Sequence, residues 1–155
     1  MNVQHAIDEL NATEKFFNRT CECLEEADAG FAPTPEMMTV AQQVAHVAGT
    51  VDWFVEGVFG GSGFDMDFEA GAARCNAVTS LAAARAWLAR AFVAARDAFA
   101  ARSDAELAAA LPENPILQGP LYGVIEAIVD HTAHHRGTLS VYARLRGKVP
   151  AMPYM

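Results

Sequence analysis

The segment Thr39–Gly63, TVAQQVAHVAGTVDWFVEGVFGGSG, contains the pattern that decides the fold of this chain. Thr39 is a favoured helix N-cap residue, and Gln42 follows three positions later, as in a capping box. Apolar residues then recur at steps of three and four, as on one face of a helix: Val40, Val44, Val47, Val51, Phe54 and Val58. The run Gly60-Gly-Ser-Gly63 interrupts this pattern. We therefore predict a helix that begins after Thr39 and ends at Gly60.

Three further segments of the chain have the same helical period. They run from about Val3 to Leu24, from Thr79 or Ser80 to about Arg102, and from about Leu121 to Arg146. Gly147 directly follows the last of them, where helices often end in a glycine. Residues 64–76, including the acidic patch Asp65–Glu69, are expected to form a polar, solvated connection. No segment alternates strictly as a half-buried strand does, so we predict an all-α four-helix bundle that forms a single domain of residues 1–155.

The composition narrows the classes of partner. The 155 residues carry a formal net charge of −8, and an acidic surface does not attract nucleic acid or an anionic membrane. No apolar run reaches the roughly 18–20 residues that cross a bilayer, and residues 1–14 lack the apolar region of a signal peptide. Three cysteines, an odd number, are most simply reduced thiols. We expect a cytoplasmic protein with no nucleic-acid or membrane partner.

Three of the five histidines form a candidate metal site. His131 and His135 are four residues apart, so on a helix they lie on one face, about 40° apart around its axis. His134 could replace one of them but could not easily join both. A third ligand must then come from another helix, and His46 is the best candidate because it lies within an apolar stretch, where an unpartnered imidazole is costly. Three histidines that leave positions for water are typical of a catalytic metal site.

Other interpretations of these residues stay open. A His-x-x-x-His pair also occurs by chance on helix surfaces, and a core histidine is usually satisfied by a hydrogen bond, so a metal-free bundle is the plain alternative. Trp53, seven residues after His46, could line a pocket beside the metal or simply pack in the core. Arg136 could bind an anionic substrate or form a surface ion pair. Glu126 and Asp130 lie off the face of the candidate ligands and are expected to be solvated or interhelical.

Several motifs resemble those of the DinB-like superfamily. The segment Asp130-His131-Thr-Ala-His134-His135-Arg136-Gly137 is similar to the signature H-x-x-H-H-R-G of that superfamily. Thr39–His46, followed by Asp52-Trp53-Phe54, resembles its histidine-bearing segment. The ending Tyr142–Pro150 resembles its usual exit from the fourth helix. These matches are spread over most of the chain and occur in the expected order.

The resemblance implies a bundle with long crossover connections, commonly a homodimer. Alanine-rich faces on the third predicted helix also suit such an interface. The resemblance further implies a divalent metal ion, nickel or zinc, held by His46, His131 and His135. Some members use a low-molecular-weight thiol, which suggests a metal-dependent transferase or isomerase acting on a small molecule, or a related hydrolase. The alternative is a non-enzymatic metal-binding or stress-response bundle. Thr138 stands where many relatives have Gln or Glu, which leaves the substrate open.

Overall fold

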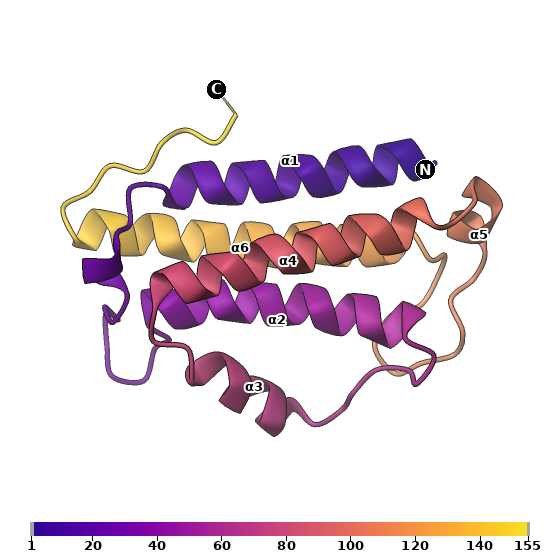
Figure 1. Ribbon diagram of the computed structural model, residues 1–155, viewed down its shortest axis with the longest axis horizontal. Helices are drawn as coiled ribbons and strands as arrows, with labels where there is room; N and C mark the ends of the chain where they lie inside the picture. Colours follow the sequence, from indigo (N-terminus) through magenta and orange to yellow (C-terminus); the bar gives the residue numbers. More distant parts are fainter. Residues whose placement is uncertain (1, 155) are drawn as a thin grey trace.

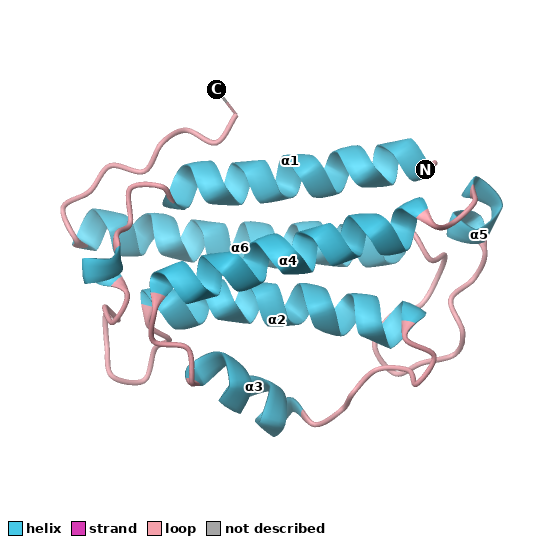
Figure 2. Ribbon diagram, in the orientation of Figure 1, coloured by secondary structure: helices cyan, strands magenta, loops and turns pink. Residues whose placement is uncertain are grey.

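The computed structural model describes residues 2–154, and its secondary structure there consists of helices and one isolated bridge between Ala110 and Pro120 (Figures 1 and 2). Four long helices form the bundle: α1 (Val3–Cys21), α2 (Val40–Phe59), α4 (Leu81–Ala100) and α6 (Gly123–Leu145). Three short elements lie in the connections: the 3-10 helix η1 (Glu26–Asp28), α3 (Phe68–Asn76) and α5 (Asp104–Ala108). The predicted all-α four-helix architecture is confirmed.

The connections determine which helices are parallel. In Figure 1, α1 and α6 run in one direction while α2 and α4 run in the other, so residues 60–80 return along the whole bundle and carry α3 along its outside. Each long helix packs against two others: α1 and α2 both contact α4 and α6. The helices α1 and α2 are therefore diagonal neighbours, and their connection crosses the end of the bundle. The connection of residues 60–80 is a long crossover of the kind that the resemblance implied.

The buried face of α2 is the one that its sequence period predicts. Val40, Val44, Val47, Val51 and Phe54 are all buried, and each such side chain contributes about 1.5–3 kcal/mol when fully removed from water. The capping box also forms, because Thr39 Oγ1 accepts a hydrogen bond from the Gln42 backbone N–H at 3.3 Å and Gln42 Oε1 accepts one from the Thr39 N–H at 2.8 Å. The capping box thus defines where α2 begins, and the burial of one face fixes the rotation of α2 about its axis.

The structure corrects the expectation for residues 64–76. Instead of a plain solvated loop, residues 68–76 form α3, and Asp67 caps it by accepting a hydrogen bond from the Ala70 N–H at 2.9 Å. Of the nine residues of α3, only Cys75 is buried. A helix that buries so little shows no apolar period, and a search for that period overlooks it. The first helix also ends at Cys21 rather than Leu24.

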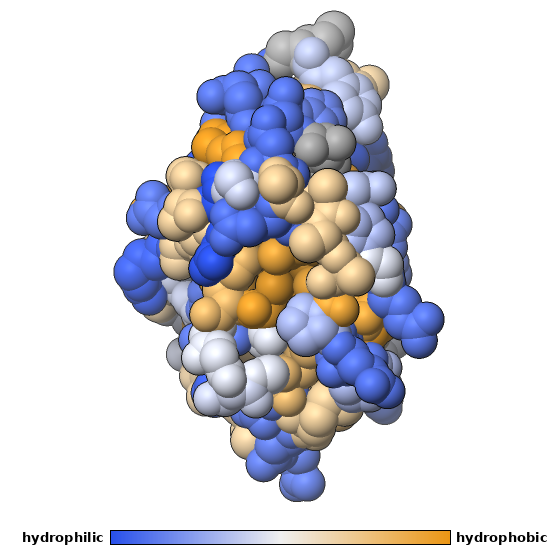
Figure 3. Space-filling model, turned by 90° about the vertical axis from the view of Figure 1, so that its right-hand side faces the viewer, coloured by the Kyte–Doolittle hydropathy of each residue, from blue (hydrophilic) through white to orange (hydrophobic). Residues whose placement is uncertain are grey.

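The two ends of the bundle close in different ways. At the end that carries α5, Leu107 is buried, and Leu111, Ile116 and Leu117 pack partly buried against the core. Figure 3 views this end, where apolar surface lies in the middle and hydrophilic residues surround it. No helix within residues 2–154 combines the length and apolar character needed to span a membrane.

Candidate metal centre

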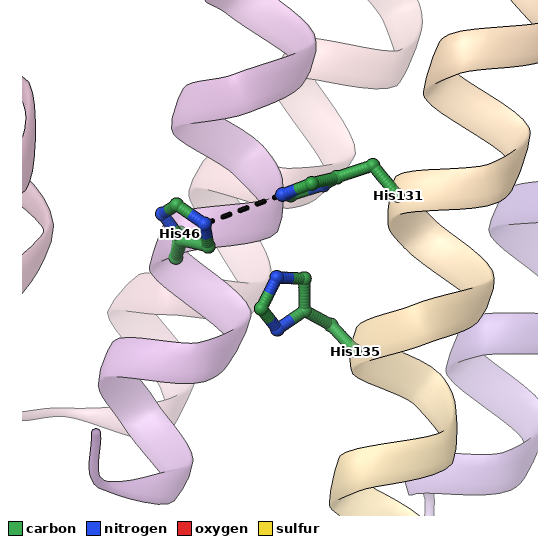
Figure 4. Close-up of side chains that lie close together, drawn as sticks. All are labelled: His46, His131 and His135. Carbon is green, nitrogen blue, oxygen red and sulfur yellow. Dashed lines mark hydrogen bonds between the residues drawn. The ribbon is translucent and has the colours of Figure 1, made fainter. Parts of the chain in front are cut away.

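Three histidines from two segments that are far apart in the sequence meet between the neighbouring helices α2 and α6 (Figure 4). His46 belongs to α2, and His131 and His135 lie one turn apart on α6. One ring nitrogen from each lies within 4.8 Å of the other two. The structure thus brings together all three residues that the sequence analysis selected as ligands.

The spacing of these nitrogens suits a shared ion. His131 Nε2 and His46 Nε2 are 3.2 Å apart. Two imidazole nitrogens that each lie about 2.0–2.1 Å from one ion, at angles between octahedral and tetrahedral, are separated by about 2.9–3.4 Å. The observed distance between His46 and His131 falls in this range, so these two nitrogens can share one ion, and a ring nitrogen of His135 lies within 4.8 Å of both.

Gln43 orients one of the imidazoles. Its side chain is 6% exposed, and its Oε1 accepts a hydrogen bond from Nδ1 of His135 at 2.5 Å. A proton on Nδ1 leaves the lone pair of Nε2 free, and Figure 4 shows the other ring nitrogen of His135 directed toward the space between the rings. Ligating histidines in proteins usually donate their second N–H in this way. Gln43 was not among the predicted site residues, although it stands about one turn before His46 on the same helix.

His131 lacks such support. Its Nδ1 is buried and has no hydrogen-bond partner among the described residues. Asp130 and Glu126 do not supply one, because both are exposed, as expected for residues off the ligand face. His131 is therefore held by packing and by its Nε2 contact rather than by an acceptor at Nδ1.

The surroundings keep all three imidazoles neutral. Burial, together with a smaller effect of the neighbouring imidazoles, lowers the pKa of His135 to about 3 and that of His131 to about 4. Burial also lowers the pKa of His46, with a smaller contribution from His134. A neutral imidazole has the lone pair that a metal needs, so the cluster does not require a proton to leave before an ion binds.

The other candidate residues lie outside the cluster. His134 is exposed, although its ring centroid is 4.9 Å from that of His135. Thr138 Oγ1 donates to the backbone carbonyl of His134, within the same helix. Arg136 forms no ion pair among the described residues: it donates to the Tyr154 hydroxyl at 3.3 Å, and its guanidinium lies 5.9 Å from the centre of the Phe16 ring. Its other predicted role, binding an anionic substrate, stays a prediction.

A cleft adjoins the cluster on the side of α2 that faces α3 and α4. Its volume is about 350 Å³, and both His46 and Trp53 line it. Trp53 also packs against Phe54 and Phe64, with ring centroids 5.0 and 4.8 Å apart. Trp53 therefore has both of its predicted roles: it lines a pocket and it packs against other apolar side chains. A metal ion held by His46 would be bound at the border of this cleft.

The fold and the cluster together define an all-α bundle with a crossover connection and a three-histidine centre between its second and last long helices. The sequence matches the model of the DinB superfamily over residues 9–139, and the chain belongs to that superfamily. The crystal structure of a DinB-like protein from Bacillus cereus ATCC 10987 is similar, with a TM-score of 0.77 over 97% of each chain at 16% identity. This likeness supports the fold. A comparison with curated proteins found no significant match.

Proposed function

We propose that this DinB-superfamily protein binds one divalent transition-metal ion, nickel or zinc, through His46, His131 and His135, and acts as a metal-dependent enzyme on a small molecule. The observation that carries the proposal is the convergence of three neutral, largely buried ring nitrogens, each within 4.8 Å of the others. Their two helices contact each other along the bundle. Without a shared ligand, three imidazoles facing one another would satisfy only one hydrogen bond among themselves.

The composition of the cluster favours catalysis over a structural ion. Within residues 2–154, the cluster contains no fourth histidine, cysteine, aspartate or glutamate. Structural zinc sites are closed by four protein ligands, whereas catalytic sites keep a position open. The cleft lined by His46 gives a small molecule access to that side of the cluster. A divalent ion here would supply a water or thiol of lowered pKa as a nucleophile near neutral pH.

The reaction class we propose is group transfer or isomerisation with a low-molecular-weight thiol, and hydrolysis is its closest variant. The support is the superfamily membership together with an open three-histidine donor set, which can accept sulfur or oxygen as a further ligand. The same donor set accepts nickel, zinc, copper or iron, so availability in the cell decides which metal is bound.

Metal titration of the protein without an affinity tag tests the site. We expect one Zn²⁺ or Ni²⁺ per chain by calorimetry. His46→Ala, His131→Ala and His135→Ala should each weaken binding by more than about 100-fold, since loss of a ligand exceeds the 10–100-fold effect of losing a residue that orients one. His134→Ala is the matched control, because it removes an adjacent imidazole from the same helix. Unchanged affinity in the three ligand variants would overturn the site.

A second measurement separates an enzyme from a bundle that only holds an ion. The protein loaded with Co²⁺ is titrated with mercaptoethanol, and a sulfur-to-cobalt charge-transfer absorption is expected if a coordination position is open. A cobalt spectrum that neither mercaptoethanol nor azide changes would instead indicate a closed, structural ion, which is the non-enzymatic alternative.

A further inference from the structure

The cleft beside α2 has the dimensions of a small-molecule site. It lies between α2, the connection before α3, α3 itself and α4, on the side of α2 where Figure 1 shows α3. Its volume of about 350 Å³ is within the range of known ligand pockets. Gly71 of α3 lines it, and a Cβ atom added there would meet no atom within 4 Å. At Gly71 there is therefore room for a side chain.

Aromatic rings form much of the wall. Trp53, Phe68 and Trp87 line the cleft, and the rings of Trp53 and Phe68 are 6.0 Å apart between centroids. Both indole N–H groups are already used: that of Trp53 donates to the Asp65 backbone carbonyl at 2.7 Å, and that of Trp87 donates to Asp52 Oδ2 at 2.6 Å. These bonds hold the two indoles in place and occupy their N–H groups. A ligand in the cleft can therefore contact only the faces and edges of these rings.

The charged groups of the lining are predominantly acidic. Four carboxylates line the cleft, from Asp52, Glu56, Asp65 and Asp67, against one guanidinium from Arg74. Three of them are oriented by the protein itself. Asp52 accepts from Trp87, Asp65 Oδ1 accepts from the Asp67 N–H, and Asp67 Oδ1 caps α3. Each of these bonds uses one carboxylate oxygen and restricts the position of its carboxylate.

We propose that the cleft binds an organic cation, an amine or quaternary ammonium group attached to an apolar body. Aromatic faces attract such cations through the ring quadrupole, and nearby carboxylates add Coulomb attraction. The same charges disfavour an anionic ligand, so a thiol that reaches the metal through this cleft would need a neutral or cationic body. His46 belongs to both the cleft and the histidine cluster. The idea that the bound cation is a substrate therefore rests on the proposed function. Binding of the cation itself does not require the metal.

The chain provides its own reporter for this cleft. It contains two tryptophans, and both line the cleft. We would titrate metal-free protein with phenethylamine, phenethyl alcohol and phenylacetate, which share a phenyl group and differ in charge, and follow indole fluorescence. Phenethylamine should bind at least about tenfold more tightly than the other two probes, and added salt should reduce this preference. Equal affinity for amine and alcohol would overturn the proposal.

Variants then locate the binding. Asp52→Asn, which can still accept from Trp87, and Glu56→Gln should each weaken amine binding by about two- to fivefold, the effect of a partly exposed charge pair. Arg74→Gln should strengthen it. Asp97→Asn, an exposed change of the same charge on α4 outside the cleft, is the matched control. If Asp97→Asn weakens amine binding as much as Asp52→Asn does, the loss of affinity is caused by the change in the protein's net charge, and the proposal is wrong.

A steric variant tests the site without altering charge. Gly71→Leu should abolish the fluorescence response to phenethylamine while circular dichroism stays that of the parent, because the new side chain enters open space. An unchanged response would place the ligand elsewhere.

The link to the metal is tested separately. In protein loaded with Co²⁺, phenethylamine should shift the cobalt absorption, since His46 lines the cleft; no shift would overturn the substrate role. If the protein binds the amine but takes up no metal, the proposed metal-dependent function is wrong and the proposed cation site still stands.

Discussion

Gln43 determines which nitrogen of His135 is available to a metal. Its buried Oε1 accepts the Nδ1 proton, and a leucine of similar size would leave that N–H without an acceptor and the ring free to change tautomer. We predict that Gln43→Leu weakens Zn²⁺ binding by about 10–100-fold. Gln43→Glu keeps an oxygen at this position and should bind at least as tightly as the parent. Competition calorimetry measures both, and equal affinities for the two variants would contradict a positioning role.

Asp28 is a second buried polar residue, and its role is structural. Its side chain is 2% exposed and accepts hydrogen bonds from Lys148 at 2.5 Å and Arg146 at 3.0 Å, which tie η1 to the chain after α6. Burial alone would raise the pKa of this carboxyl, but these hydrogen bonds and one from the Glu25 N–H lower it from 3.8 to about 2. The ionised form is therefore favoured by folding.

The sign of the pH dependence follows from that lowered pKa. The unfolded chain takes up the Asp28 proton below about pH 4, whereas the folded chain does so only near pH 2. The carboxylate thus contributes roughly 2 kcal/mol above pH 4, and this is lost as the pH falls through 2. Urea unfolding should show Asp28→Asn destabilised at pH 7 and the difference from the parent shrinking toward pH 2. A difference independent of pH would contradict this.

The sequence predicted the three clustered histidines but not the residue that orients one of them. A four-residue spacing and a histidine within an apolar stretch are local signals, and both were sufficient to select His46, His131 and His135. Gln43 gave no comparable signal, because its partner is 92 residues away and glutamine is ordinary in a helix. The place of Arg136 against the C-terminal segment was also unpredictable, since it depends on where residues 147–154 pack.

At the scale of single elements, the end of α6 illustrates a fully local signal. Gly147 has φ of +73°, and the Gly147 and Lys148 N–H groups donate to the carbonyls of Arg144 and Ala143, both at 2.9 Å, which is a Schellman motif. Gly147→Ala should lower the free energy of unfolding by about 1–2 kcal/mol, because a left-handed conformation is strained for alanine.

Gly137, in the interior of the same helix, provides the control. It is exposed, and a Cβ added there meets no atom within 4 Å. Gly137→Ala should therefore raise the free energy of unfolding by about 0.5–1 kcal/mol. Opposite signs for these two substitutions in urea unfolding are the expected result, and destabilisation by both would mean that the open space at Gly137 does not exist in solution.

The helix α3 is an element that the local sequence pattern did not predict. Its cap, Asp67, and its alanines are readable, but a helix that buries one residue has no apolar period to detect. Its position is set by the crossover that returns from the end of α2 to the start of α4. That crossover also places the acidic residues of the connection opposite Trp87, which is why the cleft was not predicted from sequence.

On the scale of the whole molecule, pairing of the helices is the feature that spacing along the chain does not specify. Four periodic segments predicted four long helices, yet the parallel arrangement of α2 and α4 depends on the 21-residue connection from 60 to 80, whose path the sequence pattern does not specify. The homodimer stays a prediction, and light scattering during gel filtration will test it.

A metal ion would join elements that the chain itself connects only through a long path. His46 and His131 are 85 residues apart, so an ion between them links α2 to α6 and binds the folded state alone. At a free Zn²⁺ concentration 100 times its dissociation constant, the ion should stabilise the fold by about 2.7 kcal/mol, which raises the unfolding temperature by about 5–10 °C in a chain of this size.

The same experiment with variants identifies the source of that rise. His131→Ala should lose it, while His134→Ala should keep it, because only the former removes a nitrogen from the cluster. The metal-free parent should nonetheless remain folded at room temperature, since its core of apolar side chains does not include the ion. An unfolded apoprotein would mean that the ion is part of the core, and would favour the structural alternative over an enzyme.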